Sequence, residues 1–175
     1  MDIEATVMSR LTSLVGLRLC VARDAAGMKN FQFGEIRPHP SGKGTVGDFA
    51  LHVQCPWRLV TTTEVLTGSA DYYEPAIEGE EVNLDDYQSG NLQRKRLQAL
   101  FQTYDAETRS LINKSDSLTV ISIDADSFSG LNLELSGGVR LQVFPDGSRA
   151  GKTGASFHRE TMSPILFNND GRLSL

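Results

Sequence analysis

The chain has 175 residues, of which 39% are hydrophobic and 22% are charged. This length suits a single domain with its own hydrophobic core, and the composition excludes a collagen-like chain and argues against a disordered one. Seventeen Lys and Arg against 22 Asp and Glu give a formal net charge of −5. That balance disfavours nucleic acid as a partner, because nucleic-acid-binding proteins normally present a basic face.

Several features of the sequence predict a cytoplasmic protein. The chain has only two cysteines, Cys20 and Cys55, so it does not rely on a framework of disulfide bonds. Asp2 and Glu4 lie close to the N-terminus, and no apolar segment typical of a signal peptide follows them. No apolar run approaches the roughly 18 residues that span a membrane, so we expect no membrane partner. The oligomeric state is left open.

The first third of the chain is predicted to form a helix followed by strands. Apolar residues recur at helical spacing over residues 3–15, and Gly16 is a natural helix end. The period then changes to two, which predicts a hairpin of strands around residues 17–22 and 31–33. Residues 37–44 contain two prolines and two glycines, so we expect a loop without regular strand pairing there.

A single strand is predicted over residues 49–57, where apolar residues occupy every second position. Pro56 lacks an amide donor, so it marks an edge, a bulge or the end of that strand. The following stretch, Arg58–Val65, is rich in β-branched residues and is also predicted to be extended. The face that we expect to be buried carries Phe49, Leu51, Val53, Cys55 and Trp57.

A second helix is predicted near residues 91–104, after an acidic connector. Its apolar stripe begins at Leu92 and ends at Tyr104. The side that we expect to face solvent carries Arg94, Lys95 and Arg96.

The last third predicts a β meander. Apolar residues alternate over residues 118–123, 131–135 and 139–143, and Gly137-Gly138 is expected to be a two-residue turn. A glycine-containing loop then precedes further short apolar segments at Phe157 and at residues 165–167.

The predicted fold class is α+β, made mostly of antiparallel β meanders with an N-terminal helix and a second helix near residues 91–104. We expect one domain over residues 1–175. Residues 1–65 and 115–175 each contain a hairpin, a Gly-Lys loop, a His and a Pro. This pattern favours a second interpretation, in which the domain consists of two degenerate internal halves joined by the acidic connector and the helix.

Two motifs are similar to ligand sites, and we interpret both as turns between strands. Residues 147–153 are similar to a phosphate-binding loop, but three residues separate the first Gly from the Gly-Lys-Thr, where four are needed. Asp124 and Asp126 suggest a calcium-binding loop, but the Gly and the Glu that such a loop requires further on are absent.

A group of candidate residues lies at the end of the predicted strand: His52, Cys55, Trp57 and Arg58. His52 and Cys55 are three residues apart, so in a regular strand they point to opposite faces and cannot share a metal ion without a bulge at Pro56. Trp57 is interpreted as core packing, with an interface anchor as the alternative, and Arg58 is expected to reach a carboxylate or solvent. We assign no catalytic, cofactor-binding or metal-binding residue and no cofactor.

A resemblance rests on residues 47–60, GDFALHVQCPWRLV. This stretch resembles a pattern in small uncharacterised bacterial proteins, in which a Gly-led strand runs into Cys-x-Trp-Arg and an aliphatic residue. Some of those proteins are similar to the immunity components of bacterial toxin systems. The resemblance extends to the rest of the chain only as a general β-rich organisation. It implies a family without an established activity, and it brings no catalytic residue to this chain.

The acidic residues are unevenly distributed. Leu59–Gln93 contains eight Asp and Glu and no Lys or Arg, whereas the remaining residues carry 17 basic and 14 acidic side chains. Acidic residues interleaved with tyrosines suit a surface that binds a basic protein, and the alternative is a solvated connector. The candidate partner surface consists of Asp71, Tyr72, Tyr73, Glu74, Glu78, Glu80, Glu81, Asp85 and Asp86.

These patterns favour a non-enzymatic intracellular binding protein. Such a protein could be an immunity-like inhibitor whose acidic surface covers a basic protein. A first alternative is a small enzyme or ligand-binding module with a pocket between the β units, using His52, His158 and nearby carboxylates. A second alternative is a structural oligomer that pairs through strand edges.

Overall fold

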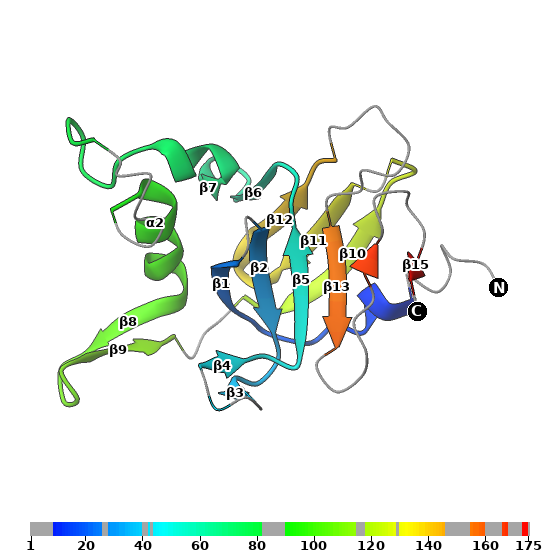
Figure 1. The fold of residues 1–175 in the computed structure, drawn as a ribbon, viewed down its shortest axis with the longest axis horizontal. Coiled ribbons are helices and arrows are strands. Elements are labelled where there is room, and N and C mark those ends of the chain that lie inside the picture. Colours follow the sequence, from blue (N-terminus) through cyan, green and yellow to red (C-terminus); the bar gives the residue numbers. More distant parts are fainter. Residues whose placement is uncertain are drawn as a thin grey trace.

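The computed structural model describes residues 9–25, 28–39, 42, 44–81, 90–114, 118–128 and 130–145, together with the strand backbone at 155–159, 166–167 and 173–174. It has an α+β fold in which antiparallel strands dominate, as predicted (Figure 1).

Two sheets contain most of the strands, and all of their strand pairs are antiparallel. The first sheet has the order β1-β2-β5-β13 and the second has the order β10-β11-β12-β6-β7. The first consists of β1 (Leu19–Ala25), β2 (Met28–Phe33), β5 (Phe49–Val53) and β13 (Ala155–Arg159). The second consists of β10 (Val120–Ala125), β11 (Leu131–Leu135), β12 (Val139–Val143), β6 (Trp57–Val60) and β7 (Val65–Gly68).

Smaller elements connect and flank these sheets. Three two-stranded pairs are β3 (Arg37–Pro38) with β4 (Thr45–Val46), β8 (Gln102–Asp105) with β9 (Ser110–Asn113), and β14 (Leu166–Phe167) with β15 (Leu173–Ser174). The helical elements are residues 9–12, the 3-10 helices η1 (Ser69–Tyr73) and η2 (Ser136–Gly138), and α2 (Leu92–Phe101). Helix α2 and the β8–β9 hairpin project from one side of the two sheets (Figure 1).

The hydrophobic core lies between the two sheets, which pack face to face (Figure 1). Phe31 and Phe33 of β2 and Leu51 and Val53 of β5 point into it, and none of these side chains is more than 2% exposed. Their spacing of two residues places them on one face of the first sheet. Full burial of such a side chain stabilises the fold by roughly 1.5–3 kcal/mol. The second sheet supplies Leu59, Leu133, Leu135, Leu141 and Val143.

The chain crosses from one sheet to the other between Val53 and Trp57. β5 ends at Val53 and β6 begins at Trp57, so the prediction of one strand over residues 49–57 is wrong. Apolar residues alternate without a break from β5 into β6, because the two strands pack against the same core from opposite sides. Pro56 lies in the crossover, which agrees with its interpretation as a strand end.

The β-branched stretch Arg58–Val65 also divides, into β6, a turn and the start of β7. The Thr61 amide donates to the Glu64 carbonyl oxygen at 2.9 Å, and the Thr61 hydroxyl accepts hydrogen bonds from the amides of Thr63 and Glu64, each at 3.2 Å. Threonine favours strands, but its hydroxyl also closes turns of this kind, and here the turn prevails.

Four further local predictions need correction. Helix α2 ends at Phe101, so Tyr104, expected on its apolar stripe, lies on β8 with 64% of its surface exposed. Pro38 pairs with Thr45 in a two-residue ladder, inside the stretch expected to be a loop. The turn between β11 and β12 contains three residues instead of two, and both of its glycines have positive φ. Val15 is 45% exposed, so it does not belong to the buried face of the first helix.

Other predictions are confirmed. β1 and β2 form the first hairpin, and β10, β11 and β12 form the meander. The first helix, by contrast, ends earlier than predicted, at Thr12, and a turn over residues 13–16 follows it and ends on Gly16, with φ of +84°. Asp126 accepts hydrogen bonds from the amides of Phe128 and Gly130, each at 2.8 Å, which makes it part of a polar turn. The loop at residues 147–153 lies outside the described residues.

The strand order mixes the two segments that we considered as internal halves. β13, from residues 115–175, belongs to the first sheet, whereas β6 and β7, which come largely from residues 1–65, belong to the second. Neither segment therefore supplies all the strands of one sheet. The duplication stays a prediction.

Candidate functional site

Helix α2 organises the two surfaces that we consider functional. It begins after Asn91, whose side-chain oxygen accepts a hydrogen bond from the Arg94 amide at 2.8 Å and so caps the helix. Leu97 and Phe101 of the helix are 4% and 5% exposed and belong to the main core. Because helical residues three and four apart share a face, the remaining polar side chains fall on two flanks of α2.

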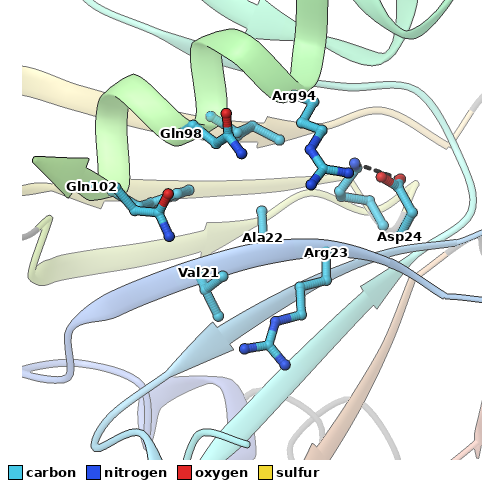
Figure 2. Close-up of a pocket in the computed structure, with 10 residues that line it drawn as sticks. Val21, Ala22, Arg23, Asp24, Arg94, Gln98 and Gln102 are labelled. Carbon is cyan, nitrogen blue, oxygen red and sulfur yellow. Dashed lines mark ion pairs between the residues drawn. The ribbon is translucent and has the colours of Figure 1, made fainter. Parts of the chain in front are cut away.

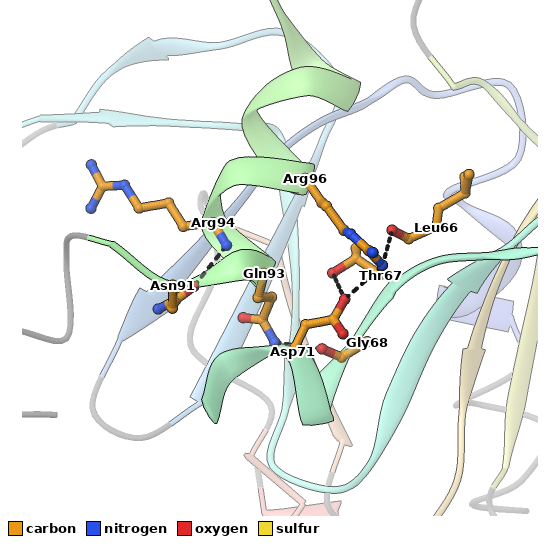
Figure 3. Close-up of polar contacts among 8 residues, drawn as sticks. All are labelled: Leu66, Thr67, Gly68, Asp71, Asn91, Gln93, Arg94 and Arg96. Carbon is orange, nitrogen blue, oxygen red and sulfur yellow. Dashed lines mark hydrogen bonds and ion pairs between the residues drawn. The ribbon is translucent and has the colours of Figure 1, made fainter. Parts of the chain in front are cut away.

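The first flank of α2 holds the acidic segment, which we define as residues 69–81 (Figure 3). Gln93 is 2% exposed, and its Nε2 donates to the Gly68 carbonyl oxygen at 2.8 Å. Arg96 Nη1 lies 3.3 Å from both the Asp71 carboxylate and the Leu66 carbonyl oxygen. Asp71 Oδ2 also accepts a hydrogen bond from the Thr67 hydroxyl at 2.9 Å. These contacts tie β7 and η1 to the helix.

Further hydrogen bonds fix the rest of this segment. The Leu92 amide donates to the Glu74 carbonyl oxygen at 2.8 Å, and Lys95 Nζ donates to the Ala76 carbonyl oxygen at 3.0 Å. On the other side, the Ser69 hydroxyl accepts from the Trp57 amide at 2.7 Å and donates to the Trp57 carbonyl oxygen at 3.1 Å. The segment is thus held by α2 on one side and by the second sheet on the other.

The outer surface of the acidic segment combines acidic and apolar groups. Tyr73 is 68% exposed and Ile77 is 57% exposed. Tyr72 is half-buried and its ring meets that of Tyr73 edge-on, with 5.3 Å between the ring centroids. Four exposed glutamates surround them, and none of these takes part in an ion pair with another described residue: Glu74, Glu78, Glu80 and Glu81.

The structure therefore sorts the predicted partner surface. It brings together Tyr73, Glu74, Glu78, Glu80 and Glu81 as exposed residues of one segment. Asp71, by contrast, is half-buried and bonded to Thr67 and Arg96 of the same chain, so it holds the segment in place and does not present a free charge. Asp85 and Asp86 lie outside the described residues.

The four residues of the strand motif do not meet in one site. His52 lies on β5, where its Nε2 is 3.0 Å from Asn30 Nδ2, and Cys55 lies in the crossover, packed partly against the core. Trp57 is 5% exposed and meets Phe31 edge-on, with 4.9 Å between the ring centroids, which confirms core packing. Arg58 is exposed.

Arg58 lies at the solvent-exposed surface, one of the two expected positions, and contacts an amide and an aromatic ring there. Its Nε donates to Gln142 Oε1 at 2.8 Å, and its guanidinium lies 4.9 Å from the centre of the Phe144 ring. Phe144 is 41% exposed, so the pair forms a cation–π contact at the surface of the second sheet.

The alternative hypothesis of a small enzyme or ligand-binding module relies on His52 and His158, and the structure places these two residues relative to each other only through the backbone pairing of their strands. β13 pairs with β5 so that Ser156 lies opposite His52 and His158 lies opposite Ala50. The side chain of His158 lies outside the described residues.

Thiol and metal chemistry find little support in the described part of the chain. Burial raises the pKa of the Cys20 thiol, against the opposing effect of Arg18, and its Sγ lies 2.7 Å from the Gly34 carbonyl oxygen. A buried thiol with a raised pKa is a poor nucleophile. Among the described residues, no group of three or more His, Cys, Asp and Glu could hold a metal ion.

A pocket of about 370 Å³ lies between β1 and the second flank of α2 (Figure 2). Arg94, Gln98 and Gln102 reach into it from the helix and its C-terminal end, and Ala22 and Asp24 point toward the helix from β1. Val21 and Arg23 leave β1 on its other side. The apolar parts of the lining include Leu97 and Phe101. His52 does not line this pocket.

Lys29 is the most unusual residue of the pocket. It lies opposite Asp24 in the β1–β2 register, with Nζ 2.5 Å from Asp24 Oδ1, and its side chain is 5% exposed. Its Nζ is also 5.9 Å from the centre of the Trp57 ring. Burial lowers the pKa of Lys29, and Asp24 opposes this shift only in part.

The sequence reasoning missed Lys29 although the sequence contains a clue. Lys29, Phe31 and Phe33 are in phase along β2, so a lysine occupies a core-facing position at the end of an apolar row. A charged residue at such a position is buried only with a partner, and Asp24 is that partner.

Comparisons with protein-family models, curated proteins and solved structures found no match to this chain. The resemblance of residues 47–60 to immunity-like bacterial proteins therefore stays a prediction. Within the described ranges, none of the helices has the length and hydrophobicity needed to cross a membrane.

Proposed function

We propose that this protein is a non-enzymatic binding protein whose acidic segment, residues 69–81, docks onto a basic protein partner. The observation that supports this function is the combination of exposed Tyr73 and Ile77 with four exposed glutamates on one segment. Acidic groups speed the encounter with a basic partner and select against acidic ones, while aromatic and aliphatic side chains supply contact area.

The way the segment is held also supports binding. A solvated connector needs no defined conformation, yet this segment receives side-chain hydrogen bonds from Lys95 and Arg96 of α2, and Gln93 holds Gly68 directly before it. An ordered segment loses less conformational entropy when a partner binds than a mobile one does. The interpretation of an immunity-like inhibitor in the cytoplasm belongs to this same proposal, and it rests on the resemblance of residues 47–60.

The test compares a charge variant with a matched control in affinity purification followed by calorimetry on the purified partner. The test variant replaces Glu74, Glu78, Glu80 and Glu81 by Gln, and leaves Asp71 in place because Asp71 is structural. We expect the variant to bind the partner at least about fourfold more weakly at low salt, since each of the four exposed charges contributes roughly 0.2–1 kcal/mol. The difference shrinks as salt screens the charges.

The control removes the same number of exposed carboxylates from other elements, through Glu35→Gln, Glu107→Gln, Asp124→Asn and Glu134→Gln. It should bind the partner like the wild type. If both variants bind the partner equally weakly, the effect arises from the net charge of the protein and not from the acidic segment, and the proposal is overturned. Unchanged binding by the test variant would do the same.

A further inference from the structure

The pocket between β1 and α2 carries an excess of positive charge at one end. Two cationic side chains, Lys29 and Arg94, line it together with a single carboxylate, that of Asp24. Arg23 also belongs to the lining, but its guanidinium donates to the Thr45 carbonyl oxygen at 2.8 Å and to the Thr45 hydroxyl at 2.7 Å. Figure 2 shows the Arg94 guanidinium beside the ion pair that ends on Asp24. This end of the pocket therefore lacks one negative charge.

The pocket also presents hydrogen-bonding groups that the described part of the protein does not use. The guanidinium of Arg94 and the side-chain amides of Gln98 and Gln102 make no hydrogen bond or ion pair with other described residues. On the other flank of the same helix, Gln93 and Arg96 are both hydrogen-bonded. Gln93 Oε1 is left without a partner among the described residues on that flank, but it is buried, whereas the exposed side chains of Arg94 and Gln98 lie on the pocket side.

The rest of the lining is apolar. Ala22 on β1 and Leu97 and Phe101 on α2 form a surface that continues into the main core. A volume of about 370 Å³ lies at the small end of the range of ligand pockets. The cavity thus combines a cationic end, amide groups at intermediate positions and an apolar wall.

We propose that this pocket binds a small carboxylic acid with an apolar body, whose carboxylate lies between Lys29 and Arg94 and whose body lies against Ala22, Leu97 and Phe101. A monoanion supplies the one negative charge that the cationic end lacks, and a carboxylate accepts the charge-assisted hydrogen bonds that ammonium and guanidinium groups donate. Burial lowers the pKa of Lys29 more than Asp24 raises it, so the ammonium group lies in a poorly solvated place where a second carboxylate would stabilise its charge. This site is separate from the acidic segment and does not depend on the protein-binding proposal.

The proposal is tested by nuclear magnetic resonance titration of the full chain with butanoate, pentanoate and hexanoate, and with hexanol and hexylamine as charge controls. We expect backbone amide shifts in β1 and α2 and an affinity that rises about threefold to fourfold with each added methylene group. Hexanoate should bind more tightly than hexanol, and hexylamine should not bind in the pocket. Equal affinity for hexanol and hexanoate, or shifts confined to other elements, would overturn the proposal.

A variant pair identifies the cationic end. Arg94→Gln should weaken hexanoate binding by about tenfold or more, because a hydrogen bond to a charged group is lost. Arg109→Gln removes an exposed arginine on the β8–β9 turn and should leave binding unchanged. Wild-type affinity in Arg94→Gln would contradict the assignment. Lys29→Met removes the second cation, but Arg94 carries the test because Lys29 is buried and its replacement also affects folding.

A last arm distinguishes two sources of the carboxylate. N-acetyl-leucine and N-acetylglycyl-leucine present the same apolar C-terminal residue, and the second compound is longer by one glycine. Tighter binding by the longer compound would assign the site to a peptide C-terminus, and tighter binding by hexanoate would assign it to a free acid. Binding of a carboxylate supports the proposal in either case, and binding by none of these acids overturns it.

Discussion

The two flanks of α2 use similar side chains for different purposes. On the first flank, Gln93 and Arg96 bind the backbone and carboxylate of the neighbouring segment. On the second flank, Arg94 and Gln98 face a pocket and make no side-chain hydrogen bond with the other residues that the structure describes. The difference separates polar groups that join parts of the fold from polar groups that are open to a ligand.

The contrast follows from helical geometry. Arg94, Lys95 and Arg96 are consecutive, so each points in a different direction around the helix axis. Lys95 and Arg96 donate to the carbonyl oxygens of Ala76 and Leu66 respectively, whereas Arg94 faces β1. A basic run in sequence is thus divided between a structural surface and a candidate binding pocket.

The largest effect on the free energy of unfolding is expected at the residue of α2 that anchors both flanks in the core. Leu97 lies between them, is 4% exposed and packs into the main core. Leu97→Ala should lower the free energy of unfolding by about 2–5 kcal/mol, through lost burial and the cavity left behind. Urea denaturation measures this change. Leu111→Ala on β9, where the side chain is 57% exposed, is the control and should stay within about 0.5 kcal/mol of the wild type. Similar losses in the two variants would show that α2 is not anchored in the core.

A matched pair of glutamine variants tests the contrast between the flanks directly. Gln93→Ala removes the donor to the Gly68 carbonyl oxygen and should cost about 1–3 kcal/mol in the free energy of unfolding, because the carbonyl is left without that partner in a buried position. Gln98→Ala, on the pocket flank, should change it by less than about 0.5 kcal/mol. Urea denaturation of both variants under one set of conditions provides the comparison. Equal effects would remove the distinction between the flanks.

Much of the fold could be predicted from the sequence because hydrophobic alternation determines which residues face the core. The meander from β10 to β12 and the β1–β2 hairpin follow this rule. The crossover between β5 and β6 could not be located in the same way, because the alternation continues across it. Both strands face one shared core, so the period of two contains no information on which sheet each strand joins.

The candidate site was predictable only in part. The uneven acidic charge identified Glu74, Glu78, Glu80 and Glu81, which are exposed. It could not show that Asp71 is engaged by Arg96, since that contact joins residues 25 positions apart. The pocket depends on the packing of α2 against β1, and such a contact between distant segments leaves no local pattern in the sequence.

The smallest expected effect concerns the pH dependence that Lys29 gives to stability. Its pKa is lowered in the folded protein from the ordinary value of 10.5, so between the lowered value and 10.5 the unfolded chain binds more protons than the folded one. The free energy of unfolding should therefore gain a contribution that rises with pH across this window. Asp24 raises the pKa of Lys29, so Asp24→Asn should lower that pKa further and make the rise larger. Urea denaturation of the wild type, Asp24→Asn and Lys29→Met from neutral pH to about 10.5 measures the differences. Lys29→Met should lose this contribution, and if its stability follows the same pH dependence as the wild type, the buried ammonium group does not titrate as the pocket geometry requires.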